Sequence, residues 1–393
     1  MTLDGQFSIL VKPASADCNL RCSYCFYREK SALYPESPKH RMSPGVLDRL
    51  IRTYMATEQH VYSFGWQGGE PTLMGLEFFQ EAVRLQQKHG RAGSLAANAL
   101  QTNGLLIDDA WARFLAGYRF LLGVSLDGPP DLHDGSRRTG SGRGTHEQVL
   151  QGIQALHRHG VQFNILTAVQ SGHRGRGGEV YRYLADSGFY FHQYIPIVEF
   201  DVSGNPLPWT IRPEDWGEFL CEAFDQWVQA DTQRVSIRQF DAILARLVDG
   251  ESPLCTMGDD CRQYFMVEHN GDIYPCDFYA EPALRLGNIM DSEWADMEGS
   301  PVRREFGSAK SRLASECRGC PFLDLCAGDC PRNRSQGSHD PGRPSWLCAG
   351  WRMFYEHSLP RFKRLARQLQ RQRARELRFR AGQGGLPCSQ TSS

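Results

Sequence analysis

The number and grouping of its cysteines constrain this chain more than any other feature. There are thirteen among 393 residues, and eleven of them fall into two groups. One group lies in CNLRCSYCFY (residues 18–27), and the other runs from Cys255 to Cys348. The first residues, MTLDGQFSILVKP, lack the basic and apolar regions of a secretory signal, so we expect a cytoplasmic protein with reduced thiols. Clustered cysteines in such a chain indicate metal or iron–sulfur ligands rather than disulfides.

The charge and hydropathy of the chain exclude two classes of partner. Lys and Arg number 44 against 45 Asp and Glu, so the net charge of −1 creates no overall field toward nucleic acid or anionic membrane. No apolar run reaches the length of a membrane span, and FLAGYRFLLGV, the nearest, is interrupted by Arg119. We therefore expect a soluble enzyme with neither a nucleic-acid nor a membrane partner.

Strand and helix patterns alternate through the first half of the chain. Six apolar, β-branched or aromatic runs are separated by stretches with helical periodicity, which predicts a parallel sheet with crossover helices. Six such units favour the α/β class and a partial (β/α)6 barrel of the TIM type over a full eight-unit barrel. The runs cover residues 7–13, 60–66, 94–104, 119–128, 161–169 and 189–197, and the helical stretches cover 43–57, 76–89, 108–117, 145–159 and 178–187.

The pattern changes after about residue 210, and we predict four segments. A barrel at 1–210 is followed by a helical linker region at 211–254 and a cysteine-rich domain at 255–350, in which Asn270-Gly271 is a good hairpin turn. Residues 351–393 should form a helix, which Pro360 could end, and a disordered tail of about ten residues. Residues 361–380 hold nine Arg or Lys and one Glu, which indicates a solvated basic helix rather than a nucleic-acid arm.

The unusual residues follow the predicted strands. The first cysteine group, QGGEP (residues 67–71), Asn103, Ser125 and Asp127 all lie at or just past the carboxyl ends of strands. In parallel barrels this rim is where chemistry is assembled.

Cys18, Cys22 and Cys25 form C-x3-C-x2-C. Three thiolates can hold three irons of a [4Fe-4S] cluster and leave the fourth iron open, and S-adenosylmethionine offers amino and carboxylate groups to such an iron. The alternative is zinc, which favours four ligands, but the nearest following Cys or His is His40.

CNLRCSYCFY after a first strand, with GGEP after the second, resembles the radical S-adenosylmethionine superfamily. The resemblance implies that Cys18, Cys22 and Cys25 bind the catalytic cluster. Without the resemblance, Gly68-Gly69 would indicate only a tight turn, and Ser125 and Arg137 would be read only as surface residues. The resemblance also implies contacts to S-adenosylmethionine. Tyr24, His192 and Gln193 would lie near its adenine, and Ser125 and Arg137 at its ribose and carboxylate. Its amino group would meet Gly68, Gly69, Glu70 and Pro71, with Glu70 or backbone carbonyls as the acceptors.

The second group, from Cys255 to Cys348, holds eight cysteines, which is two complete sets of four. By count, they could hold two [4Fe-4S] clusters or two zinc ions. Their arrangement resembles the SPASM extension of peptide-modifying radical enzymes, and within it the anaerobic sulfatase-maturating enzymes. That resemblance implies three [4Fe-4S] clusters in all. Cys221, expected in the core, and Cys388, in the tail, would bind no cluster. The implied sets are Cys255, Cys261, Cys276 and Cys330 for the first auxiliary cluster, and Cys317, Cys320, Cys326 and Cys348 for the second.

Asp277 directly follows Cys276, and the family resemblance implies that it is the general base. A carboxylate beside a cluster and an apolar wall should have a raised proton affinity, whereas the plain alternative is a surface aspartate that ends a strand.

The implied reaction is a two-electron oxidation of Cys or Ser in a Cys/Ser-x-Pro-x-Arg sulfatase motif to Cα-formylglycine, with 5′-deoxyadenosine and methionine as co-products. The implied partners are an unfolded or nascent sulfatase and a low-potential electron donor such as flavodoxin or ferredoxin. Glu199 or Asp201 could bind the arginine of the sulfatase motif.

Three other functions share parts of this pattern. Another SPASM peptide maturase, which forms thioether or carbon–carbon crosslinks, would share nearly all the motifs except Asp277 after Cys276. A radical enzyme that acts on a small molecule would not bind a peptide. A non-catalytic zinc scaffold would be colourless, against brown protein with about twelve iron per chain.

Overall fold

The computed structural model describes residues 6–36, 38–335 and 342–383. One sheet of ten strands organises it, in the order β10-β9-β8-β1-β2-β3-β4-β5-β6-β7. The six predicted strands are all present and pair in parallel as neighbours, which confirms the α/β class and the partial (β/α)6 barrel. Their bounds are β1 (Ser8–Lys12), β2 (Val61–Trp66), β3 (Leu95–Thr102), β4 (Leu121–Ser125), β5 (Phe163–Val169) and β6 (Phe191–Pro196).

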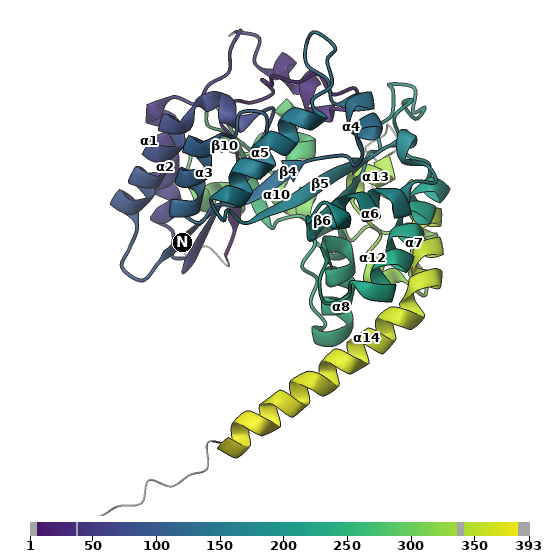
Figure 1. The fold of residues 1–393 in the computed structure, drawn as a ribbon. Helices are drawn as coiled ribbons and strands as arrows, with labels where there is room; N and C mark the ends of the chain where they lie inside the picture. Colours follow the sequence, from purple (N-terminus) through teal and green to yellow (C-terminus); the bar gives the residue numbers. More distant parts are fainter. Residues whose placement is uncertain (1–5, 37, 336–341, 384–393) are drawn as a thin grey trace, which may run out of the picture.

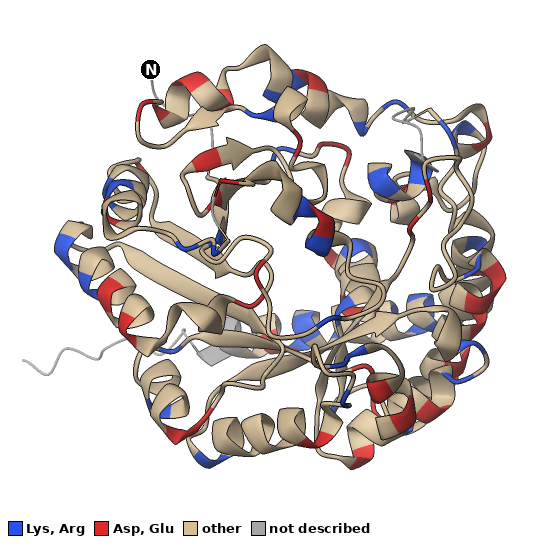
Figure 2. Ribbon diagram, turned by 90° about the horizontal axis from the view of Figure 1, so that it is seen from above, with Lys and Arg blue, Asp and Glu red and all other residues tan. Residues whose placement is uncertain are grey.

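The predicted crossover helices lie close to their expected positions. Each buries an apolar stripe against the strands, as Leu47, Leu50 and Ile51 do in the first helix. In Figure 2 the helices surround the strands, and most charged residues lie on this outer ring. The helices are α1 (Pro44–Met55), α2 (Leu76–His89), α3 (Asp109–Gly117), α5 (His146–Arg158) and α6 (Gly177–Asp186), with a short α4 (Pro130–Ser136) that was not predicted.

The cysteine-rich segment extends the barrel sheet. Strand β8 (Tyr264–Glu268) pairs in parallel with β1, with Ser8 opposite Tyr264 and Lys12 opposite Glu268. The hairpin predicted at Asn270-Gly271 joins β8 to β9 (Asp272–Tyr274), and Gly271 has the positive φ of 92° that such a turn requires. The boundaries at residues 210 and 254 stay predictions, because this pairing joins the segments on either side of them in one sheet.

Three long helices cover the other edge of the sheet. Helix α7 (Pro213–Ala230), α8 (Arg238–Asp249) and α14 (Cys348–Gln383) pack together through Phe224, Phe240, Phe354 and Phe362. Pro360 lies inside α14, so the expectation that it could end the helix is wrong. The aromatic contacts on both sides of Pro360 outweigh the hydrogen bond that its missing N–H removes.

Beyond this packing, α14 leaves the body of the molecule (Figure 1). The predicted disordered tail and Cys388 lie outside the described residues. Among the described helices, none is long and apolar enough to span a membrane. The remaining elements are β7 (Ser236–Ile237), β10 (Gly287–Asn288), α9 (Trp294–Glu298), α10 (Pro301–Ala309), α11 (Ser315–Arg318), α12 (Leu323–Cys326), α13 (Pro331–Ser335) and the 3-10 turns Phe26–Leu33, Pro71–Met74, Ser171–His173, Cys255–Met257, Asp277–Tyr279 and Pro282–Leu284.

Candidate active site

The first cysteine loop (residues 18–25) lies on the rim of the barrel and is held by the segment after β4. The backbone N–H of Arg21 donates to the carbonyl of Arg138 at 2.8 Å, and that of Ser23 to the carbonyl of Ser136 at 3.2 Å. The loop is therefore fixed at both ends of its central stretch by a segment that is distant in sequence.

The three thiols of this loop are close enough to affect one another. Burial raises the pKa of Cys18 to about 12, and the charges of Cys22 and Cys25 add to that rise. Burial likewise raises the pKa of Cys22 to about 11. Thiols of this kind become thiolates when a metal centre replaces the proton, and three thiolates in a short loop fit three corners of a [4Fe-4S] cluster.

The glycine pair after β2 lies against the backbone that precedes Cys18. The N–H of Gly69 donates to the carbonyl of Ser15 at 2.7 Å. A Cβ atom on Gly69 would lie 2.0 Å from the carbonyl oxygen of Asp17, so any larger residue forces the two loops apart. The tight turn at Gly68-Gly69 therefore also supports the first cysteine loop.

The carboxylate of Glu70 is buried and already occupied by the fold. Its Oε1 accepts hydrogen bonds from the backbone and hydroxyl of Thr72 (3.0 and 2.6 Å) and from the hydroxyl of Thr102 (2.8 Å), and its Oε2 accepts from the backbone N–H of Asn103 (2.7 Å). Burial raises the pKa of Glu70, and these hydrogen bonds oppose the rise. Of the two acceptors expected for the amino group, the backbone carbonyls beside Glu70 are thus favoured.

Tyr24 and Arg137 meet at a buried carboxylate. Asp127 Oδ2 accepts from the Tyr24 hydroxyl at 2.5 Å and from Arg137 Nε at 2.9 Å, and the guanidinium lies over the Tyr24 ring at 5.5 Å. Burial alone would raise the pKa of Asp127, but the charge of Arg137 holds it below its usual value. Ser125 is also buried, at the end of β4, two residues before this carboxylate.

The two residues predicted on β6 lie on opposite faces of that strand. Gln193 lines a pocket inside the barrel, together with residues of β1 to β5. The His192 ring packs on Tyr181 of α6 and hydrogen bonds to the carbonyl of Phe189 at 2.8 Å, in the layer between strand and helices. The structure thus does not bring His192 to the other predicted cofactor residues, because successive side chains of a strand point in opposite directions.

Asp277 lies where the barrel and the cysteine-rich segment meet. Its Oδ2 is 3.4 Å from Lys12 Nζ of β1 and accepts from Gln67 Nε2 at 3.1 Å, while its Oδ1 accepts from the Tyr264 hydroxyl at 3.0 Å. The Tyr264 hydroxyl also lies 3.1 Å from Cys276 Sγ.

This environment corrects one expectation. Burial would raise the pKa of Asp277, but the charge of Lys12 and the hydrogen bond from Tyr264 hold it below its usual value. The predicted raised proton affinity is therefore wrong, and the carboxylate is held ionised.

Four of the eight downstream cysteines surround one small pocket of about 50 Å³. Aromatic side chains, including Tyr264, Phe278 and Tyr279, complete its wall. Burial raises the pKa of two of these thiols strongly, that of Cys261 to about 11 and that of Cys330 to about 12. Thiols in an aromatic wall form a donor set suited to an iron–sulfur cluster. The four are Cys255, Cys261, Cys276 and Cys330.

The other four cysteines gather around the start of α14. Burial and the neighbouring charges of Cys317 and Cys320 raise the pKa of Cys348, and burial together with the charge of Cys348 raises that of Cys326 to about 12. The structure thus brings together the same two sets that the resemblance implies. In the described part of the chain, no three His, Cys, Asp or Glu side chains are placed to hold a single metal ion.

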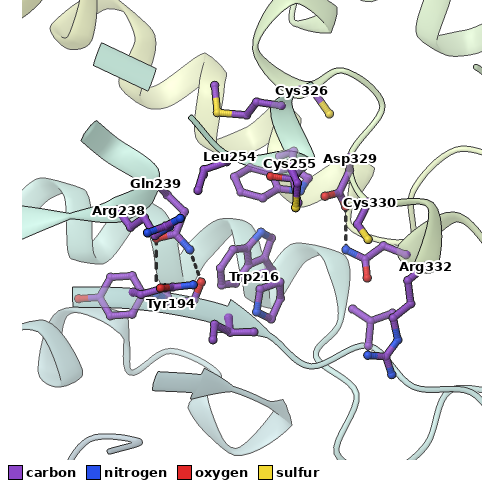
Figure 3. Close-up of a pocket in the computed structure, with 18 of the residues that line it drawn as sticks. Tyr194, Trp216, Arg238, Gln239, Leu254, Cys255, Cys326, Asp329, Cys330 and Arg332 are labelled. Atoms are coloured by element: carbon purple, nitrogen blue, oxygen red, sulfur yellow. Dashed lines mark hydrogen bonds between the residues drawn. The ribbon is translucent and has the colours of Figure 1, made fainter. Parts of the chain in front are cut away.

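A pocket of about 340 Å³ separates β6 from these cysteine loops. Figure 3 shows sulfur atoms of Cys255, Cys326 and Cys330 facing it, opposite Tyr194 and Gln239. Members of both auxiliary sets therefore face one pocket at the mouth of the barrel.

The two carboxylates predicted to meet a substrate arginine have partners within the chain. Glu199 forms an ion pair with Arg332, whose guanidinium lies over the rings of Phe26 and Phe278 at 4.5 and 4.2 Å. Asp201 accepts hydrogen bonds within its own exposed turn (residues 201–205).

Sequence reasoning missed Lys12, Gln67 and Tyr264 as partners of Asp277. Gln67 directly precedes GGEP and could have been included by position. Lys12 and Tyr264 carried a weaker signal: a lysine and a tyrosine within otherwise apolar strands, in segments that only the unpredicted β1–β8 pairing brings together.

Comparison with known proteins agrees with this geometry. Residues 13–173 match the family model of the radical SAM superfamily, and residues 255–321 match that of an iron–sulfur cluster-binding domain, SPASM. The fold and site therefore define a radical SAM enzyme with an auxiliary iron–sulfur domain, and the predicted cofactors, S-adenosylmethionine and [4Fe-4S] clusters, are confirmed for this class.

More specific relatives cover nearly the whole chain. The serine-type anaerobic sulfatase-maturating enzyme of Bacteroides thetaiotaomicron is 35% identical over 93% of this chain and 92% of its own length. The cysteine-type enzyme of Clostridium perfringens is 35% identical over 92% of this chain and 99% of its own. A solved structure described as native anSMEcpe with bound AdoMet and Cp18Cys peptide has a TM-score of 0.87, with 35% identity over 93% of this chain and 100% of that chain. The chain belongs to the family of anaerobic sulfatase-maturating enzymes.

Proposed function

We propose that this enzyme oxidises a Cys or Ser side chain in a sulfatase Cys/Ser-x-Pro-x-Arg motif to Cα-formylglycine. The observation that carries the proposal is the contact set of the Asp277 carboxylate, which joins Lys12 and Gln67 of the barrel to Tyr264 beside the first auxiliary cysteine set. Family relatives of both the serine and the cysteine type are 35% identical, so the proposal includes both side chains.

Eleven cysteines hold the metal centres in this proposal. Three [4Fe-4S] clusters would be bound, one by the first cysteine loop (residues 18–25) and one by each of the two downstream cysteine sets. S-adenosylmethionine would bind the open iron of the cluster in the first cysteine loop. When bound, these cofactors would supply the radical chemistry that oxidises the substrate Cβ, and sites that would accept the excess electron. The ligands are Cys18, Cys22 and Cys25; Cys255, Cys261, Cys276 and Cys330; and Cys317, Cys320, Cys326 and Cys348.

The chain's own residues would orient S-adenosylmethionine. Tyr24, fixed by Asp127, and Gln193 would line its adenine side. The backbone carbonyls of Gly68 and Gly69 would accept from its amino group. Arg137, held beside Tyr24, and Ser125 would contact its ribose and carboxylate. We leave His192 out of this site, because its ring is buried in the helical layer.

Asp277 takes the proton of the substrate thiol or hydroxyl at its carboxylate. Lys12, Gln67 and Tyr264 hold both oxygens in place, so that the base is ionised and oriented before the substrate arrives. These contacts come from both the barrel and the cysteine-rich segment. Docking of the two segments therefore assembles the base.

The substrate is an unfolded or nascent sulfatase, bound as an extended peptide at the mouth of the barrel. The pocket of about 340 Å³ there offers room for side chains that flank the reacting residue. A low-potential protein such as flavodoxin or ferredoxin supplies the electron, and the enzyme works in the cytoplasm.

Mass spectrometry tests the proposal. The reconstituted, reduced enzyme is mixed anaerobically with S-adenosylmethionine and a synthetic peptide that contains Cys- or Ser-x-Pro-x-Arg. Formylglycine formation lowers the peptide mass by about 18 for cysteine or about 2 for serine, and 5′-deoxyadenosine accumulates. Deoxyadenosine with no change in peptide mass would contradict the proposed substrate but not the radical chemistry.

A further inference from the structure

A buried cation lies between the two auxiliary cysteine sets and has no part in the chemistry described above. Lys310 follows α10 and is fully buried. Its Nζ donates hydrogen bonds to the carbonyl oxygens of Thr256 (3.0 Å), Ala327 (3.0 Å) and Asp329 (2.5 Å). Three donors on three acceptors are the pattern of a charged ammonium, because a neutral amine has only two hydrogens to donate.

We infer that Lys310 is a positioning residue that ties the two auxiliary cluster sites together and, through its charge, favours reduction of the clusters bound there. The inference deepens the proposed function, since it concerns the sites that accept the excess electron, but it needs no statement about the substrate.

The position of Lys310 supports the structural half of this inference. The three carbonyls belong to neighbours in sequence of Cys255, Cys326 and Cys330. Cys255 and Cys330 are in the first set and Cys326 is in the second. One ammonium therefore holds loops of both sets, and its charge opposes the rise in thiol pKa that burial causes at Cys255 and Cys326.

The charge balance supports the electrostatic half. Arg334, also buried, donates to the carbonyls of Gly328 (2.6 Å), Ala327 (3.0 Å) and Asp329 (3.0 Å). The buried carboxylate of Asp329 accepts from Asn333 and Ser345. Lys310 and Arg334 therefore place two positive charges in one buried region, beside the backbone carbonyls of Ala327 and Asp329, which is favourable only where negative charge lies close by.

A [4Fe-4S] cluster with four thiolates supplies that negative charge. Its net charge becomes more negative by one when it accepts an electron, so a nearby buried cation stabilises the reduced form more than the oxidised form. Removing the cation should therefore shift the reduction potential to a more negative value.

Potentiometric titration followed by electron paramagnetic resonance tests the inference. The parent protein carries C18A, C22A and C25A, which leaves about eight iron per chain in the two auxiliary clusters. K310M and K310Q remove the charge, K310R keeps it, and K88M removes an exposed lysine of α2 as the matched control. We expect more negative midpoint potentials in K310M and K310Q, and values close to the parent in K310R and K88M.

Several results decide the matter. Unchanged potentials in K310M or K310Q at full iron content would overturn the inference. If both neutral variants lose iron while K310R retains it, the charge itself is required at the sites, as inferred. Equal loss of iron in all three position-310 variants would show a packing requirement only and would also overturn it. The titration contains no peptide, so failure of the proposed peptide oxidation would not affect these outcomes.

Discussion

Asp277 shows how much of a single residue's chemistry depends on contacts that are distant in sequence. Its position after Cys276 pointed to a base, but its state depends on Lys12, 265 residues away. A charge at that distance cannot be paired from one sequence, because only the β1–β8 pairing brings it near. The sequence therefore indicated the residue but predicted the wrong direction for its pKa.

Replacing Asp277 by Asn should separate radical formation from peptide oxidation. The amide keeps the shape of the side chain but cannot take a proton, so we expect formylglycine to fall by roughly 10²–10⁴-fold while 5′-deoxyadenosine still forms. The ratio of the two products, measured by liquid chromatography and mass spectrometry, checks this. D186N, at the exposed end of α6, is the matched control and should leave the ratio unchanged. Equal peptide yields in D277N and the parent would show that another group is the base.

Gly69 makes a second prediction at this scale. An added Cβ would lie 2.0 Å from the Asp17 carbonyl oxygen, in the backbone next to Cys18. Gly69→Ala should displace the first cysteine loop and lower the iron content by about four per chain, the content of one cluster. Gly117→Ala, where a Cβ has open space, is the control and should keep all iron. Full iron in Gly69→Ala would show that the loop tolerates the displacement.

At the scale of elements, helix α14 has two parts with different roles. Phe354 and Phe362 are fully buried against α7 and α8, whereas Leu377 is 68% exposed where the helix leaves the body. The periodicity of Trp351, Phe354 and Phe362 predicted a helix, but a local rule about proline could not predict that tertiary packing would carry it past Pro360.

The two parts of α14 should respond differently to truncated side chains. Phe354→Ala leaves a cavity among Phe224, Phe240 and Phe362 and should lower the free energy of unfolding by about 3–5 kcal/mol. Leu377→Ala should change it by less than about 0.5 kcal/mol. Anaerobic denaturant titration measures both. Similar losses in the two variants would mean that the exposed part of α14 has a partner in solution.

The elements themselves were largely predictable. All six barrel strands and the five crossover helices were expected within a few residues, because hydrophobic periodicity is a local property. The helix α4 was missed because PDLHDGS has no apolar stripe. The partners of β1 were also missed: a sequence pattern shows that a strand exists but not which strand lies beside it.

At the scale of the whole molecule, two buried histidines make stability depend on pH. Burial lowers the pKa of His133 and of His192 to about 4 in the folded state, against about 6.5 in an unfolded chain. The unfolded state therefore binds more protons as the pH falls below 6.5, and stability is lost until the pH reaches about 4. Between pH 7.5 and 5.5 each histidine should lower the free energy of unfolding by about 1.3 kcal/mol.

Replacing one histidine should reduce this dependence. We expect the loss between pH 7.5 and 5.5 to be smaller by about 1.3 kcal/mol in His192→Gln, because the variant has one fewer proton to bind. Anaerobic denaturant unfolding at the two pH values measures it for each protein. His60→Gln, at an exposed position, should lose as much as the parent. The same loss in His192→Gln would place the pH dependence elsewhere.

The pairing of β1 with β8 has a consequence for how the chain is made. During synthesis β1 emerges well before Tyr264–Glu268, the strand that covers one of its edges. Until then an apolar strand has one open edge, which is where chains pair wrongly with one another. Release of the nascent chain before residue 264 should therefore give insoluble barrels. The cysteine-rich segment is therefore also needed for folding, because its strand β8 completes the sheet of the barrel.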